Sequence, residues 1–143
     1  MSSPKTGTSK TSKQMHYSVG AIIKINGKYL LIDRKNAPLG FAGLAGHVDE
    51  GEDEIQALVR EVAEESGLKV EGYNLLFQEE LDWNWCSKGA GTHFWFLYEC
   101  EVSGRLKDKI PEAKSIGWHS PEEIGKMKLE PVWEYWFKKL ALV

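Results

Sequence analysis

The stretch Gly46–Leu68, GHVDEGEDEIQALVREVAEESGL, carries the strongest structural signal in the chain. Its second half predicts a helix over Asp53–Ser66, because apolar residues recur at helical spacing and acids occupy the first turn. Gly67 follows where a left-handed glycine commonly ends a helix. The residues expected on the apolar side of this helix are Ile55, Leu58, Val59 and Val62.

The polar side of the predicted helix carries three glutamates: Glu61, Glu64 and Glu65. At about 100° of rotation per residue, they fall within an arc of about 100° beside the apolar side, so we expect them at the edge of the core. Like charges at this spacing destabilise a helix unless something compensates. Cations are the simplest compensation, and oxygen ligands favour hard ions such as Mg²⁺ or Mn²⁺.

An acidic helix face that only contacts water is the alternative interpretation, since runs of charge commonly do no more. Two features favour a site instead. A segment with Gly40, Gly43 and Gly46 precedes the helix and allows backbone to approach a ligand closely. Arg60 lies among the acids, where its guanidinium can brace them.

The order of these residues resembles the signature of the Nudix hydrolase family. Gly46, Glu52 and the run Arg60-Glu61-Val62-x-Glu64-Glu65-x-Gly67-Leu68 match every fixed position of its Nudix box. The resemblance extends loosely from His16 to the C-terminal helix. It implies an α/β fold, an α/β/α sandwich around a mixed β-sheet, with the box forming a loop-helix-loop. It also implies a MutT-like enzyme that uses Mg²⁺ or Mn²⁺ to hydrolyse a diphosphate linkage in a nucleotide-like substrate.

The same resemblance suggests a role for each residue of the box. Glu61, Glu64 and Glu65 correspond to metal ligands, and Glu61 or a neighbouring acid is placed to activate water. Glu52 resembles a further ligand or a supporting acid, and Arg60 a brace that orients the carboxylates. The main chain at Ala45 and Gly46 is expected to bring a carbonyl oxygen to the metal.

Outside the box the resemblance suggests residues that also have ordinary structural interpretations. Glu112 has the spacing to Trp118 that is typical of an additional ligand or base, and an exposed loop glutamate is the alternative. Arg34 and Lys35 are candidate phosphate contacts or simple surface cations. Aromatic rings that could stack on a base, or only pack, are Phe41, Trp83, Trp85 and His93.

Several substrate classes remain open. Leu44-Ala45-Gly46 replaces the commoner Pro-Gly-Gly. Its Ala-Gly pair is found in many ADP-ribose-cleaving members, but those usually carry a proline about 15 residues past the box, where this chain has Leu81 to Trp85 and no proline. Leu129 stands where the oxidised-guanine branch has a base-reading asparagine, which weakens that assignment. A nucleoside triphosphate or another nucleoside-diphosphate-linked compound is the main expectation. ADP-ribose or nucleotide-sugar cleavage, RNA 5'-end hydrolysis and non-catalytic nucleotide binding are the alternatives.

The rest of the chain predicts one domain over residues 15–143, after a disordered tail over residues 1–14 that is rich in Ser, Thr, Lys and Gly. A strand from His16 to Ile25 should turn at Asn26-Gly27 into a partner from Lys28 to Asp33. Further strands are expected over residues 73–81, 93–102 and 116–119. Ser120 before Pro121 predicts a short helix, and Pro131 opens a last helix whose shared face holds Val132, Tyr135, Trp136 and Leu140.

Composition narrows the class of protein further. The net charge of −3 argues against nucleic-acid polymers as the main partner. The sequence offers no apolar run of about 20 residues and no secretory signal, so we expect a cytoplasmic protein without a membrane partner. Cys86 and Cys100 form no C-x-x-C pair and no recognisable Cys/His cluster, which favours reduced thiols over a zinc site. A homodimer is compatible with the sequence but not required by it.

Overall fold

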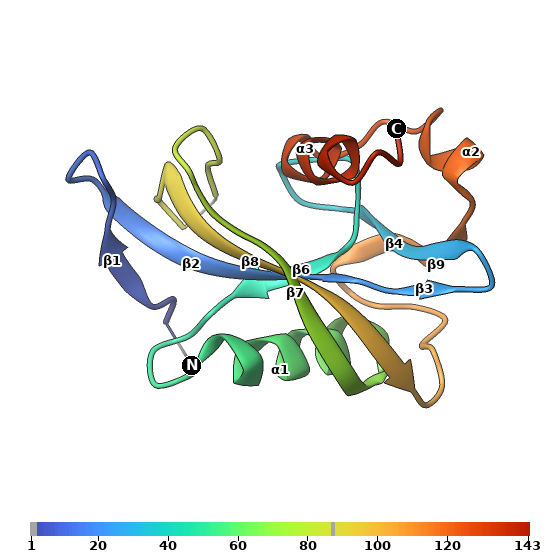
Figure 1. The fold of residues 1–143 in the computed structure, drawn as a ribbon. Coiled ribbons are helices and arrows are strands. Elements are labelled where there is room, and N and C mark those ends of the chain that lie inside the picture. The colour runs from blue at the N-terminus through green and yellow to red at the C-terminus, as the bar shows by residue number, and fades with distance from the viewer. Residues whose placement is uncertain (1–2, 87) are drawn as a thin grey trace.

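The computed structural model describes residues 3–86 and 88–143, which fold into a mixed β-sheet and a smaller antiparallel sheet covered by helices. Helix α1 (Glu54–Ser66) lies on one side of the strands and α3 (Pro131–Lys139) on the other, as Figure 1 shows. Strand β2 (Gln14–Ile22) runs through the centre. This arrangement confirms the α/β sandwich predicted from the sequence.

The larger sheet surrounds β2. It contains β1 (Thr6–Thr8), β6 (Leu44–His47), β7 (Lys69–Leu81) and β8 (Thr92–Ser103). Strand β8 pairs parallel with β2, whereas β1 and β6 pair antiparallel with it. The register places Gly20 opposite both Ala45 of β6 and Leu97 of β8, so β6 and β8 lie on the two sides of β2.

The smaller sheet continues from the end of β2. It contains β3 (Lys24–Ile25), β4 (Lys28–Arg34), β5 (Phe41–Ala42) and β9 (Ala113–His119). The predicted strand from His16 to Ile25 is therefore divided between two sheets. Asn26 and Gly27 form the predicted turn with φ of 53° and 76°, a conformation that asparagine and glycine tolerate.

Helix α1 begins and ends as its sequence predicts. The Asp53 side chain accepts a hydrogen bond from the Gln56 amide at 2.8 Å, and the Gln56 side chain accepts one from the Asp53 amide at 2.9 Å. Gly67 closes the helix in the left-handed conformation, with φ of 79°. Val59, predicted on the apolar face, is instead 41% exposed, because the buried side follows Ala57, Leu58 and Val62.

Two further helices begin with proline. Ser120 caps α2 (Pro121–Ile124) by accepting a hydrogen bond from the Glu123 amide at 3.2 Å. Helix α3 begins at Pro131, as predicted, but its fully buried face differs from the predicted one. The buried residues of α3 are Val132, Trp133, Trp136 and Phe137.

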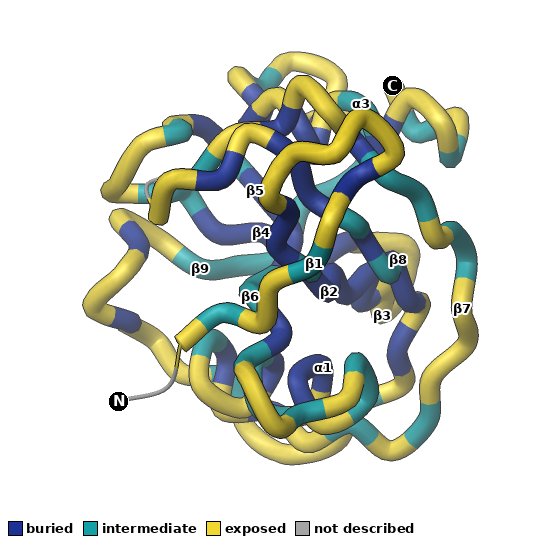
Figure 2. The backbone as a smooth tube through the Cα atoms, turned by 90° about the vertical axis from the view of Figure 1, so that its left-hand side faces the viewer, coloured by how far each residue is buried: buried dark blue, intermediate teal, exposed yellow. Residues whose placement is uncertain are grey.

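Aromatic residues of α3 form much of the core. Trp133, Trp136 and Phe137 are completely buried, and the Trp133 ring meets Trp95 of β8 edge to face at 6.3 Å between centroids. The buried segments in Figure 2 gather along the central strands and the inner sides of the helices. Gly20 and Gly43 lie directly against the Trp133 ring, so small residues in the strands make room for the large ones of the helix.

Over residues 3–14 the N-terminal segment differs from the disordered tail predicted for residues 1–14, of which residues 1 and 2 lie outside the described part of the chain. Thr6–Thr8 forms β1 and pairs with Gln14, Met15 and His16 of β2. The Lys5 amide also donates to the Val48 carbonyl at 2.8 Å. Composition missed this strand because backbone pairing with a neighbouring strand needs no apolar side chains.

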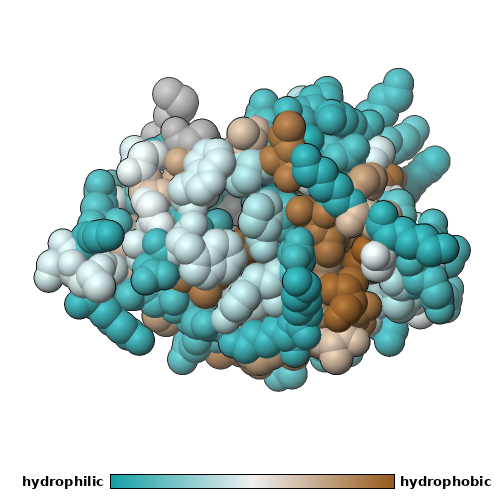
Figure 3. All heavy atoms as spheres, turned by 90° about the horizontal axis from the view of Figure 1, so that it is seen from above, coloured by the Kyte–Doolittle hydropathy of each residue, from teal (hydrophilic) through white to brown (hydrophobic). Residues whose placement is uncertain are grey.

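The molecular surface over α3 mixes apolar and hydrophilic atoms, as the view from above shows (Figure 3). Large apolar side chains near this region that stay partly exposed include Leu39, Trp83 and Trp85, each between 45% and 50%. Within residues 3–86 and 88–143, no helix is long and apolar enough to cross a membrane.

The packing of Trp133 gives a direct test of the core. A Cβ atom at Gly43 would lie 2.6 Å from the buried indole, whereas one at Gly117 would meet no atom within 4 Å. We expect Gly43→Ala to lower the free energy of unfolding by about 1 to 3 kcal/mol, because the ring cannot move without disturbing the core. Gly117→Ala should change it by less than about 1 kcal/mol. Urea unfolding of both variants measures the difference, and equal stability would contradict this account of the packing.

Candidate active site

Arg60 organises the acidic residues of the Nudix box. Its Nε donates to Glu52 Oε2 at 2.7 Å, and Nη1 donates to Glu61 Oε1 at 2.7 Å. Nη2 donates to the backbone carbonyl of His47 at 2.9 Å and lies 3.3 Å from Asp49. One guanidinium thus joins α1, the loop before it and the end of β6. These contacts raise the pKa of Arg60 and lower that of Glu52, chiefly through the hydrogen bond between them.

The end of β6 lies directly against two of the glutamates. The Ala45 amide donates to Glu65 Oε1 at 2.8 Å. Gly46 faces the Glu61 carboxyl group so closely that a Cβ atom at this position would overlap it. The close approach therefore requires glycine, and it brings the main chain of residues 45 and 46 beside the carboxylates of α1.

Glu61 and Glu65 are partly buried acids. Burial raises the pKa of Glu61 to about 7, although Arg60 acts in the opposite direction. Burial also raises the pKa of Glu65 well above its ordinary value, and the charge of Glu61 adds to this effect. Two neighbouring carboxylates that resist ionisation, with backbone carbonyls nearby, are a donor set that fits a hard divalent cation.

The remaining predicted acids are less enclosed. The Glu64 side chain is 59% exposed and lies 3.4 Å from Arg60 Nη1, so it does not stand at the edge of the core as expected. Glu112 is exposed in the segment before β9, yet its charge contributes to the raised pKa of Glu65. Both acids can therefore approach a ligand that lies over Glu61 and Glu65.

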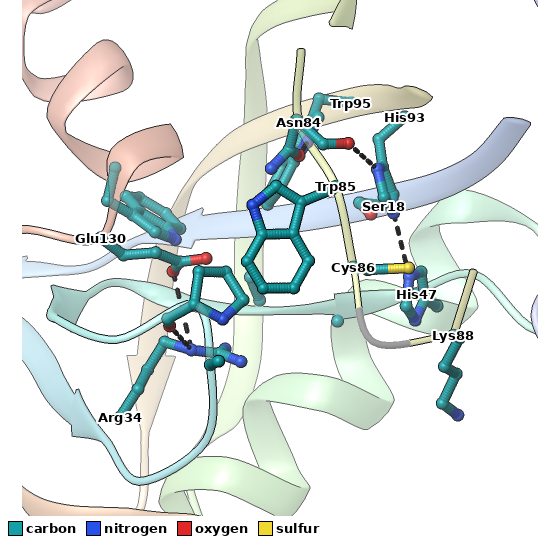
Figure 4. A pocket seen from close by; sticks show the side chains of 15 residues that line it. Ser18, Arg34, His47, Asn84, Trp85, Cys86, Lys88, His93, Trp95 and Glu130 are labelled. Atoms are coloured by element: carbon teal, nitrogen blue, oxygen red, sulfur yellow. Dashed lines mark hydrogen bonds and ion pairs between the residues drawn. The ribbon is translucent and has the colours of Figure 1, made fainter. Parts of the chain in front are cut away.

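An open pocket lies beside the box, between β6, the end of β4, the loop after β7 and the start of α3 (Figure 4). Arg34 and Glu130 lie on one side, with Arg34 Nε 4.0 Å from Glu130 Oε2. Trp85, which is 50% exposed, lies in the middle of this view. Ala45 and Gly46 line the same pocket, so it opens next to the acidic cluster.

The predicted substrate contacts separate into two groups. Arg34, Trp85 and His93 line this pocket. Trp83 lines a smaller neighbouring hollow and packs edge to face on Tyr135 at 5.5 Å between centroids. Phe41 and Lys35 are not part of the lining described for this pocket. Phe41 instead packs against His119, and Lys35 is exposed.

Glu130 is a pocket residue that sequence reasoning did not select. It is 6% exposed, and burial raises the pKa of its carboxyl group to about 7, while Arg34 lowers it less strongly. Asn84 is another: its side chain accepts from Trp95 Nε1 at 2.7 Å, and its carbonyl lies 2.7 Å from His93 Nδ1. The sequence signal for both is weak, since a glutamate before a helix and an asparagine in a loop are common on surfaces.

The sequence pattern indicated no Cys/His cluster, but the fold places Cys86 beside His16, His47 and His93. Cys86 and Cys100 are both free thiols, as expected from the sequence. The four residues of the cluster are separated by long stretches of sequence, so no local spacing could reveal it. Burial and the neighbouring imidazoles lower the pKa of His47 to about 4.

Comparisons with known proteins agree with this geometry. The sequence model of the NUDIX domain matches residues 14–140. The structure resembles the MutT NUDIX hydrolase from Burkholderia pseudomallei, with 25% identity over 91% of this chain and 97% of that one, and a TM-score of 0.73. It also resembles the E. coli ORF135 protein, with 28% identity over 87% and 86% of the two chains and a TM-score of 0.66.

A third likeness shows the fold alone. The NUDIX domain of Shewanella oneidensis NrtR, solved in complex with ADP ribose, is 18% identical over 87% of this chain and 85% of that one, with a TM-score of 0.71. No curated protein sequence is significantly similar to the chain.

The fold and the box together define a pyrophosphohydrolase of the MutT-like type. The chain belongs to the Nudix family, because the family match covers almost all of the sequence and includes the complete box.

The buried Glu130 carboxyl predicts a dependence of stability on pH. Its pKa of about 7 in the folded chain exceeds the value of about 4.3 expected after unfolding. The folded state therefore binds this proton more tightly, and stability is lost as the pH rises from about 4.5 to about 7. Glu130→Gln should remove this loss and stabilise the chain by up to about 3 kcal/mol at pH 8, with little gain at pH 4.

Thermal unfolding at both pH values measures this effect, with Glu122→Gln on the exposed face of α2 as the control. The same difference between Glu130→Gln and the wild type at pH 4 and pH 8 would contradict it.

Proposed function

We propose that the chain hydrolyses a diphosphate linkage in a nucleoside triphosphate or another nucleoside-diphosphate-linked compound, with Mg²⁺ or Mn²⁺ as the cofactor. The observation that carries this proposal is the contact between the backbone of Ala45-Gly46 and the partly buried carboxyl groups of Glu61 and Glu65. A cation favours the ionised form of two partly buried acids that lie this close to one another.

Glu61, Glu64 and Glu65 are the proposed ligands, with Glu52 and the carbonyl groups of residues 45 and 46 as additional donors. A divalent cation bound here would neutralise charge on the phosphoryl oxygens and lower the pKa of a bound water. Arg60 holds Glu52 and Glu61 in place through its hydrogen bonds. Its proposed role is therefore to position the carboxylates before the substrate arrives.

Hydrolysis requires one water to attack phosphorus, one P–O bond to break and one proton to leave the water. Glu61 is the proposed acceptor of that proton, because it lies directly against Gly46, which lines the pocket. Glu112 is the second candidate, supported by its electrostatic influence on Glu65. A general base has to be within hydrogen-bonding reach of the water, and both acids flank the same carboxylate cluster.

The pocket supports a substrate with a planar ring and a phosphate chain. Trp85 offers an exposed indole for stacking, and the Arg34 guanidinium lies beside it as a candidate phosphate contact. Buried Glu130 and Asn84 offer polar groups that could read the edge of a ring. This pocket, unlike an extended basic path, favours a small nucleotide over a nucleic-acid polymer.

A substrate panel tests the proposed reaction. We expect the wild type to release phosphate or pyrophosphate from at least one nucleoside triphosphate, nucleotide sugar, ADP-ribose or dinucleoside polyphosphate when Mg²⁺ or Mn²⁺ is present. Glu64→Gln should lower kcat by about 100-fold or more, because it removes one charge that holds the cation. Glu71→Gln, an exposed glutamate of β7 outside the box, should leave kcat unchanged.

Two results would overturn the enzymatic proposal. One is binding of a panel compound by the wild type without turnover, which would instead indicate a nucleotide-binding module. The other is equal turnover by the wild type and Glu64→Gln. Competition by a short triphosphorylated RNA that exceeds competition by mononucleotides would redirect the proposal to RNA ends.

Gly46 provides an independent test of the cation site. In Gly46→Ala the added methyl group should push the Glu61 carboxyl aside, since this flexible group can move without disturbing the core. We expect the variant to remain folded by circular dichroism and to lose about 10- to 100-fold in activity at limiting Mg²⁺. A rise in the Mg²⁺ concentration needed for half-maximal rate would identify weaker cation binding as the cause. Unchanged Mg²⁺ dependence would contradict the proposed placement of Glu61.

A further inference from the structure

A second group of metal-binding side chains lies at the opposite end of the pocket from Arg34 and Glu130. It consists of His16 from β2, His47 from β6, Cys86 from the loop after β7 and His93 from β8. Each offers one ligand atom, and the four atoms lie within 4.8 Å of one another. Of these four residues only His47 lies within the Nudix box, at a position that the signature leaves variable.

The spacing of these atoms suits a tetrahedral metal. Metal–nitrogen distances of about 2.0 to 2.1 Å and a metal–sulfur distance of about 2.3 Å give tetrahedron edges of about 3.3 to 3.6 Å. His47 Nε2 lies 3.2 Å from His93 Nε2, and Cys86 Sγ lies 3.7 Å from His16 Nδ1. Two opposite edges of the cluster are thus near these lengths, and small side-chain movements would adjust the others.

Hydrogen bonding already orients one ligand. His93 Nδ1 lies 2.7 Å from the carbonyl oxygen of Asn84, which can only accept, so Nδ1 carries the proton. The Nε2 lone pair of the neutral ring then points at the cluster, toward His47 (Figure 4). A backbone carbonyl that fixes the tautomer of a histidine is the usual partner of a metal-binding imidazole.

The chemistry of the donors selects the ion. Three imidazoles and one thiol favour a borderline-soft ion such as Zn²⁺, whereas Mg²⁺ prefers oxygen ligands. With four protein ligands the coordination sphere is complete, as in structural zinc sites, which keep no open position for a substrate.

We propose that His16, His47, Cys86 and His93 bind one Zn²⁺ ion that fastens the loop after β7 to the central sheet. This loop carries Asn84 and Trp85, both of which line the pocket. The ion links the loop to β2, β6 and β8, so it stabilises the side of the pocket that the loop and Trp85 form. The site is separate from the oxygen-ligand cation site of the box, and it does not depend on the proposed reaction.

Cobalt(II) spectroscopy tests the site without any activity assay. The full chain is stripped of metal with a chelator, kept reduced, and titrated with Co²⁺ in excess Mg²⁺ to occupy the box. We expect one equivalent of Co²⁺ to produce a thiolate-to-cobalt charge-transfer band and intense tetrahedral ligand-field bands. One equivalent of Zn²⁺ should abolish both. A wild-type chain without the charge-transfer band would overturn the proposal.

Matched variants identify the ligands. Cys86→Ser should eliminate the charge-transfer band, whereas Cys100→Ser, the other free cysteine, should retain it. His16→Asn should weaken Co²⁺ binding at least about tenfold while the thiolate band remains at saturation. A band of equal intensity in Cys86→Ser, or one lost only in Cys100→Ser, would contradict the assignment.

Thermal unfolding provides a second readout. Zn²⁺ at about 100 times its Kd should raise the Tm of the wild type by roughly 8 °C and that of Cys86→Ser by less than about 2 °C. Circular dichroism establishes that the wild type and Cys86→Ser are both folded before metal is added. An equal Tm increase in the two chains would place the Zn²⁺ ion elsewhere.

Discussion

The contact between the end of β6 and α1 is the constraint on which the rest of the site depends. Gly46 leaves no room for a side chain beside Glu61, and the amide of Ala45 donates to Glu65. Both acids consequently lie partly buried next to backbone, where desolvation raises their pKa values. Arg60 offsets part of the desolvation cost of these carboxylates, because it donates hydrogen bonds to Glu61 and Glu52. It also donates to the carbonyl of His47. The helix, the loop and the strand are thereby held in one arrangement.

The same strand also connects the acidic cluster to the pocket. Ala45, Gly46 and His47 line the pocket, while Glu61 lies immediately behind Gly46. The aromatic core supports this arrangement from the other side, because the buried Trp133 packs against Gly43 and also lines the pocket. In the proposed function, phosphate chemistry and ring recognition therefore take place on adjacent surfaces of β6.

Local signals predicted helices and turns well, and nonlocal contacts account for the differences. Helix caps and turns depend on contacts within a few residues, so their roles follow directly from the sequence. This holds for the caps at Asp53, Gly67 and Ser120 and for the turn at Asn26-Gly27. The exposure of Val59 depends on where neighbouring strands end, and the pairing of Thr6–Thr8 depends on an available strand edge. Likewise, the division of the strand His16–Ile25 between two sheets depends on its partners, β8 and β4.

By itself, the sequence determined the family and the acidic helix, because the spacing within Gly46–Leu68 is local and helical geometry turns it into a shared face. The tertiary structure alone decided which side chains from distant segments meet. It placed Trp85 and His93 at the pocket with Arg34. Lys35 is instead exposed, and Phe41 packs against His119. It also brought Cys86 to three histidines from separate strands. Sheet pairing sets these distances, and pairing between remote strands leaves no periodic pattern in the sequence.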